Sequence, residues 1–151
     1  MNSLKQRIND DLKTALLGGD RFAAETLRVL KAALLNDEVA KNKRDEGLSD
    51  QEVEEVLAKE LKKRLESAAL YEQNNRDDAA DSEHREADII RRYLPKQLTE
   101  AELKTIVDAK IAELDATDTK MMGQVIVAVK HEVGTSAEGA LIAKLVKESL
   151  G

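Results

Sequence analysis

The chain has 151 residues, of which 42% are apolar and 36% charged, and it contains neither cysteine nor tryptophan. The lack of cysteine excludes a disulfide framework, a thiolate zinc site and a cysteine nucleophile. The longest apolar run, over residues 125–129, has five residues, far short of the roughly 20 that a membrane-spanning helix needs. No apolar stretch precedes the first charges, which argues against a secretory signal. We therefore expect a soluble cytoplasmic protein that does not bind membranes.

The charge of the chain limits its possible partners. Lysine and arginine total 24 against 30 acidic residues, which gives a formal net charge of −6. A protein with this balance is not held on nucleic acid by its overall charge. The distribution is uneven, because all nine arginines precede Pro95 and the seven cations that follow it are lysines.

The first two thirds of the sequence predict four helices. Apolar residues recur at the three- and four-residue spacing of an amphipathic helix, and good helix formers are abundant. Ser3, Asp20, Ser49 and Asp77 stand where N-caps are expected; Ser3 heads a capping box with Gln6, and Ser49 heads another. The predicted helices run over about residues 4–17, 21–44, 50–71 and 78–94.

The remainder of the chain predicts three shorter helices. Thr99 heads a third capping box, and Asp118 or Thr119 begins the next helix, which Gly134 ends. The segment Thr135–Glu138 has the pattern of a fourth capping box, placed directly before the last helix. These helices are about half as long as the longest ones before them.

Helices of such unequal length pack poorly into one bundle, so the sequence predicts two. The expected fold class is all-α, with an N-terminal antiparallel four-helix bundle followed by a compact C-terminal three-helix bundle. We expect the first bundle over residues 1–94, a joint over residues 95–98 around the single proline, and the second bundle over residues 99–151.

Residues that would carry chemistry are scarce. His84 follows Asp81 by three residues, which is half of the pattern of a di-metal site in a helical bundle, and the second half is missing. No serine stands in a Gly-x-Ser-x-Gly elbow, and no Gly-rich phosphate loop is present. We therefore predict no catalytic residue, no cofactor and no metal.

One basic stretch has two interpretations. Lys59, Lys62 and Lys63 are neighbours on a helix and would form a positive ridge able to meet phosphates. Acidic residues such as Glu60 and Glu66 lie on the same helix. The alternative is therefore a solvated face of mixed ion pairs.

Several ordered segments resemble the YqeY family. They are spread over the whole sequence, at Leu4–Ile8, Thr26–Leu34, Tyr93–Leu103, Met122–Ile126 and Leu141–Leu150. The resemblance implies a four-helix bundle joined to a three-helix bundle, in agreement with the prediction from caps and periodicity. It also implies kinship with the tail domain of the B subunit of the glutamine-dependent Asp-tRNA/Glu-tRNA amidotransferase, a module that helps to hold the tRNA.

The resemblance also bears on activity. Such families are often described as carbon–nitrogen ligases with glutamine as the amide donor, but that description fits an enzyme with separate glutaminase and ATP-binding parts. Neither part is found in this sequence. We expect a non-catalytic helical module, at most an accessory to the amidotransferase, whose partner is tRNA or an amidotransferase or translation protein.

The chain departs from the family near the expected binding surface. Members usually read Gly-Arg-Ala-Asp-Gly before the last helix and often carry lysine where Gln124 stands, whereas Gly134–Gly139 here contains no arginine. Each cation lost weakens phosphate binding and its salt dependence. Amides at the start of the last helix can still receive a phosphate. The candidate RNA- or partner-binding residues are Gly123, Gln124, Lys130, Thr135, Ser136, Gly139 and Lys144.

Two further hypotheses come from other classes of protein. The apolar row of Met121, Met122, Val125 and Val129 is either the core of the second bundle or an exposed groove, in which case the protein is an adaptor that docks a helix or a partner subunit. The third hypothesis is an enzyme of amide transfer, for which the catalytic parts are missing.

Overall fold

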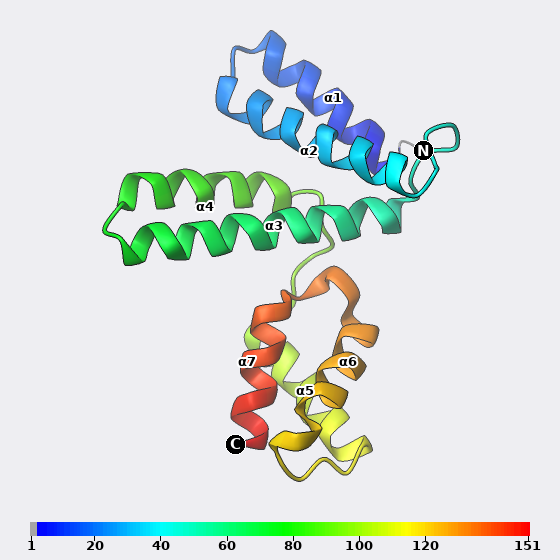
Figure 1. The fold of residues 1–151 in the computed structure, drawn as a ribbon, viewed down its shortest axis with the longest axis vertical. Coiled ribbons are helices and arrows are strands. Elements are labelled where there is room, and N and C mark those ends of the chain that lie inside the picture. Colours follow the sequence, from blue (N-terminus) through cyan, green and yellow to red (C-terminus); the bar gives the residue numbers. More distant parts are fainter. Residues whose placement is uncertain (1–2) are drawn as a thin grey trace. The chain divides into compact units, whose positions relative to one another are not determined.

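The computed structural model describes residues 3–151, and every regular element in that range is a helix (Figure 1). This confirms the all-α prediction for the described residues. The α-helices are α1 (Leu4–Leu17), α2 (Arg21–Ala40), α3 (Asp50–Gln73), α4 (Asp77–Arg91), α5 (Glu100–Glu113), α6 (Met122–Val133) and α7 (Gly139–Leu150). Two short 3₁₀ helices, η1 (Thr119–Met121) and η2 (Gly134–Ser136), precede and follow α6.

The chain divides into two compact units, Met1–Leu94 and Pro95–Gly151. Each unit has its own cluster of buried apolar side chains. Residues 95–98, expected as a joint, are hydrogen-bonded inside the second unit, because Leu98 N donates to Ser136 O over 2.8 Å.

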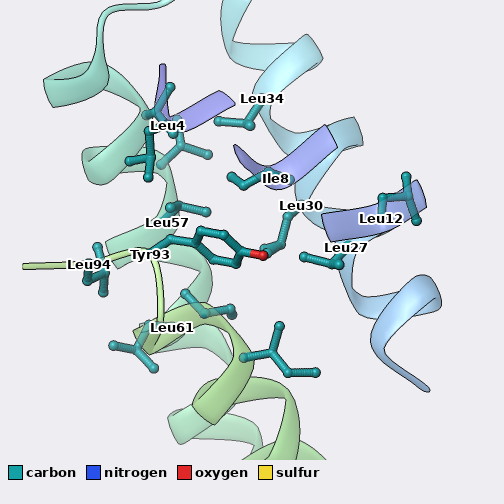
Figure 2. Close-up of a cluster of buried hydrophobic side chains, with 14 of the residues drawn as sticks. Leu4, Ile8, Leu12, Leu27, Leu30, Leu34, Leu57, Leu61, Tyr93 and Leu94 are labelled. Atoms are coloured by element: carbon teal, nitrogen blue, oxygen red, sulfur yellow. The ribbon is translucent and has the colours of Figure 1, made fainter. Parts of the chain in front are cut away.

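The first unit consists of two helical hairpins, α1–α2 and α3–α4 (Figure 1). Their shared core takes residues from all four helices, and its innermost members include Ile90. Ile8, Leu30 and Leu57 are also among them (Figure 2). From α3 this core takes residues up to Leu65, and from α4 it takes residues from Ala87 onward. The two hairpins therefore share a core only where α3 begins and α4 ends.

Tyr93 fastens the end of this unit to α1. Its ring is buried among the core leucines (Figure 2), and its hydroxyl donates to Oδ2 of Asp11. The guanidinium of Arg7 lies 5.4 Å from the centre of the ring, within the range of a cation–π contact. Burial, followed by the neighbouring Asp11 carboxylate, raises the pKa of Tyr93. The hydroxyl therefore stays protonated and remains a donor.

The second unit packs α5, α6 and α7 around one core (Figure 1). Its fully buried side chains are apolar and come from all three helices: Leu103, Val107, Val125, Val129, Ile142 and Val146. Because no described aromatic residue belongs to this cluster, the core of this unit is built from aliphatic side chains.

The predicted helix ends are correct in some places and wrong in others. Both halves of the capping boxes at Ser49 and Thr99 are present. At Ser3 only one half forms, because the Gln6 side chain bonds to Asp10 instead of reaching back. Asp77 lies inside α4 and is not its cap, since Arg76 precedes the helix without a side-chain cap bond.

Helix α2 is shorter than predicted. It ends at Ala40, four residues before the predicted end at 44. Asn42 takes a left-handed conformation with φ of 60°, and Lys43 N then bonds back to Glu38 O over 2.7 Å. Asparagine is one of the few residues that adopt this conformation readily, and it ends a helix in the way that glycine does.

Glu52 makes the stability of the first unit depend on pH. It accepts a hydrogen bond of 2.9 Å from Lys43 Nζ and one of 3.1 Å from Ser49 N. The Lys43 ammonium, followed by the Ser49 amide, lowers the pKa of Glu52 from its ordinary 4.5 to about 2. A carboxylate whose pKa is lower in the folded state than in the unfolded state stabilises the folded protein. The full stabilisation is present above the unfolded-state pKa, and it is lost as the pH falls through the folded-state pKa.

We therefore expect the free energy of unfolding of Glu52→Gln to depend less on pH in the acid range than that of the wild type. The urea midpoint of the wild type should fall more between pH 5 and about pH 2 than that of the variant, because only the wild type loses this carboxylate's contribution. Glu55→Gln, at an exposed position of the same helix, is the control and should keep the wild-type slope. Equal slopes for wild type and Glu52→Gln would contradict the assignment.

Candidate functional site

The turn between α6 and α7 is the centre of the predicted site. Gly134 ends α6 with φ of 56° and ψ of −127°, a conformation that is essentially restricted to glycine. The chain then makes the 3₁₀ turn η2, becomes extended at Ala137, and α7 begins at Gly139. The predicted fourth capping box is therefore wrong, because Thr135 and Ser136 belong to η2 and Glu138 is the N-cap position of α7.

Gln97 holds this turn from one side. Its Nε2 donates to Thr135 O and to Pro95 O, each over 2.9 Å. With the bond from Leu98 N to Ser136 O, the segment after Pro95 is bonded to the second and third residues of η2. The Gln97 side-chain amide thus donates one hydrogen bond to the turn before α7 and one to its own segment. Sequence reasoning missed Gln97, and its position beside the proline gave no indication of a role at a turn 38 residues later.

Lys130 lies beside the first residue of α7. A Cβ atom added at Gly139 would lie 3.5 Å from both Cε and Nζ of Lys130. Such distances are ordinary van der Waals contacts, so the end of the Lys130 side chain lies against the start of the helix. Lys130 is exposed and forms no ion pair among residues 3–151.

This arrangement favours an anion. The amino end of a helix carries a partial positive charge and amides without partners inside the helix. Placing the Lys130 ammonium there brings two positive groups together, which an anion between them would stabilise. The geometry therefore suits a phosphate or a carboxylate at the Gly139 end of α7.

The structure brings some of the predicted site residues together. Thr135 and Ser136 are half-buried in η2, next to Lys130 and Gly139 in the chain turn. Lys144 is exposed about 7.5 Å further along α7, at 1.5 Å per residue. Its ammonium lies 3.6 Å from Oε1 of Glu100, and both side chains are more than half exposed. Such an exposed pair contributes little to stability, so Lys144 can exchange its partner.

Gly123 and Gln124 are not part of this cluster. They lie exposed in the first turn of α6, while Lys130 lies in its last turn. The spacing from Gly123 to Lys130 is about 10 Å along the helix, and Gln124 is rotated by roughly 120° from Lys130 around its axis. Gly123, seven residues before Lys130, lies on the same side of α6, and Gly123 and Gln124 stay predictions from the sequence.

The apolar row on α6 belongs to the core. Val125 and Val129 are 0% exposed, and Met121 and Met122 are half-buried against the same cluster. The interpretation of this row as an exposed docking groove is therefore wrong. The spacing of apolar residues in the sequence could not distinguish a groove from a core, because both have the same helical spacing.

The basic stretch on α3 is a face of mixed ion pairs. Lys63 lies 3.0 Å from Glu60, and Lys62 lies 3.9 Å from Glu66. A nearby cavity of about 510 Å³ is lined by Lys63, Arg64 and three glutamates, with Ser67 and Leu70. Burial and then the neighbouring Glu83 raise the pKa of Glu86 in that lining. The crowded carboxylates make this cavity a poor phosphate site.

The remaining candidates are surface contacts. His84 pairs with Glu72 over 2.8 Å, and Asp81 is exposed on the same helix. Within residues 3–151 no cluster of His, Cys, Asp or Glu has the geometry to hold a metal ion. None of the helices in that range combines the length and the apolar character that a membrane crossing requires.

The described residues form an all-helical protein of two units, and the turn between α6 and α7 lies on the second. The model of the family described as Yqey-like protein matches residues 5–150 of the chain. The chain therefore belongs to the YqeY-like family, as the resemblance predicted.

Several curated relatives share one name, "Altered inheritance of mitochondria protein 41, mitochondrial". The relative from Clavispora lusitaniae is 26% identical over 138 residues, which cover 89% of this chain and 78% of the relative. The one from Meyerozyma guilliermondii is 37% identical over 94 residues, 62% of this chain and 46% of the relative. A Saccharomyces cerevisiae relative is 27% identical over 128 residues, 84% of this chain and 66% of the relative.

These relatives contradict the prediction of a cytoplasmic location, because each of them is named as a mitochondrial protein. The prediction rested on composition, charge and the lack of apolar segments. Those properties separate membrane and secreted proteins from the rest, but they do not distinguish one aqueous compartment from another.

Proposed function

We propose that this YqeY-like protein is a non-catalytic module that binds RNA, with tRNA as the expected class, through the start of α7. The observation that carries the proposal is the Lys130 ammonium beside Gly139. Helix amides and a lysine together form a phosphate site without base readout. The resemblance to the amidotransferase tail domain supports tRNA over other RNA.

In this proposal the chain assists a glutamine-dependent amidotransferase and does not transfer the amide group itself. We further propose that the all-α fold is an antiparallel four-helix bundle followed by a three-helix bundle. The relatives are named as mitochondrial proteins, which favours mitochondria as the compartment of this chain.

Binding should be weak, and it should fall only moderately as the salt concentration rises, because few cations meet phosphates. With few cations and no stacking platform on the second unit, affinity comes from phosphate contacts alone, for which dissociation constants are about 10⁻⁴ to 10⁻⁶ M at physiological salt. The test is a titration of the full chain with bulk tRNA at about 50 and 200 mM salt. Binding no tighter than that of an unrelated acidic protein would overturn the proposal.

We expect Lys130→Gln to weaken tRNA binding several-fold and to lower the salt slope by about 1, as the loss of one phosphate contact should. Lys104→Gln is the matched control. Lys104 is exposed on α5 and paired with Asp108 over 2.7 Å. The control should bind as the wild type does, and an equal loss in both variants would show that only overall charge matters.

A further inference from the structure

The outer side of the α1–α2 hairpin carries an uncovered row of side chains. On α2 the row comprises Arg28, Lys31, Leu35 and Val39, at spacings of three and four residues that place them on one side of a helix. Leu35 is 42% and Val39 56% exposed. At the start of the row the hairpin adds Leu16 from α1, which is 49% exposed.

A shallow cavity lies at that end of the row. It measures about 290 Å³, and Leu16 shares its lining with Arg21, Ala24 and Arg28 of α2. The cavity lies between the end of α1 and the beginning of α2. Its lining combines apolar side chains with the guanidinium groups of Arg21 and Arg28 and the carboxylates of Asp20 and Glu25.

The cations of this surface have no partners. Arg21, Arg28 and Lys31 form no ion pair within residues 3–151. Other cations of the same hairpin do form pairs, since Lys5 pairs with Glu38 and Lys41 with Asp37. Among the described residues, none of the three forms an ion pair with a carboxylate or a cation–π contact with an aromatic ring, although Asp20 and Glu25 share the cavity lining with Arg21 and Arg28.

We propose that this surface, which comprises Leu16, Arg21, Arg28, Lys31, Leu35 and Val39, docks an acidic amphipathic helix of a partner protein. A third helix fits along two antiparallel helices by packing its apolar row between theirs. Its flanking glutamates or aspartates then meet the three cations. RNA would gain nothing from the exposed Leu16, Leu35 and Val39, whereas the apolar row of an amphipathic helix would cover them.

The inference is independent of the tRNA proposal, because it concerns the first unit only. Its probe is a labelled synthetic helical peptide with leucines at positions i, i+4, i+7 and i+11 and glutamates beside them. A second peptide keeps the leucines and replaces every glutamate by lysine. Fluorescence anisotropy with the full chain should show binding of the acidic peptide and at least tenfold weaker binding of the basic one.

Variants of the chain locate the site. Arg28→Glu with Lys31→Glu should weaken acidic-peptide binding at least tenfold, and Arg28→Gln with Lys31→Gln should weaken it less. The control, Lys59→Glu with Lys62→Glu on α3, should change it less than twofold. Circular dichroism confirms that each variant folds, and the glutamine pair serves as the test if the glutamate pair does not.

Three outcomes would overturn the inference. The first is equal binding of both peptides, and the second is a charge reversal on α2 without effect. The third is loss of tRNA binding in the Arg28 and Lys31 variants, which would make this surface an RNA interface instead.

Discussion

Replacing Leu57 by alanine is expected to lower the free energy of unfolding of the first unit by about 2 to 5 kcal/mol. Leu57 is 0% exposed and lies where the two hairpins share their core (Figure 2). Removing its branched end loses apolar burial and leaves a cavity that the surrounding leucines fill only in part. Because the hairpins share a core only where α3 begins and α4 ends, few other contacts compensate.

The measurement is urea unfolding followed by tyrosine fluorescence. Tyr71 and Tyr93 are the two tyrosines of the chain, and both precede Pro95, so their signal reports on the first unit while circular dichroism reports on all helices. The matched control is Leu70→Ala on the same helix, where the side chain is 60% exposed and the expected loss is within about 0.5 kcal/mol. Similar losses for the two variants would contradict the assigned core.

Replacing Gln97 by methionine is expected to loosen the α6–α7 turn and to destabilise the second unit by about 1 to 3 kcal/mol. Methionine keeps the length of the side chain but removes the donor that Thr135 O and Pro95 O share. Both carbonyls then lose a partner in a partly buried position. Hydrogen exchange should accelerate at the amides of residues 136–140, which follow the released turn.

The same variant should bind tRNA more weakly, because the start of α7 is no longer held in one position. Lys96→Met is the control, since it changes the exposed neighbouring residue and leaves the Gln97 bonds intact. Unchanged exchange in Gln97→Met would contradict the role of Gln97 in the turn. Accelerated exchange with unchanged tRNA binding would instead place the RNA contact elsewhere.

Local signals in the sequence predicted much of the fold. The capping boxes at Ser49 and Thr99 and the stop at Gly134 were correct because each depends on residues within one turn of the helix end. The second and fourth helices were placed correctly but given wrong ends. The backbone is left-handed at Asn42, and Arg76 precedes α4 without a side-chain cap bond. At both positions the sequence permits several backbone conformations, so it did not predict the helix end.

The candidate site depended on contacts between distant residues. Lys130 and Gly139 were both predicted, but their contact joins the last turn of α6 to the first residue of α7 across a turn whose geometry the sequence pattern does not give. Gln97 was missed because it acts on Thr135 from a different segment. Gly123 and Gln124 were included on resemblance alone, and the length of α6 separates them from the others.

A backbone-amide NMR titration of the full chain with bulk tRNA at low salt tests the central claim most directly. We expect the signals of Gly139, Ala140 and Lys130 to shift or broaden first. The signals of Gly123 and Gln124, at the far end of α6, should change least within the second unit. Changes confined to the first unit, or the largest changes at Gly123 and Gln124, would contradict it.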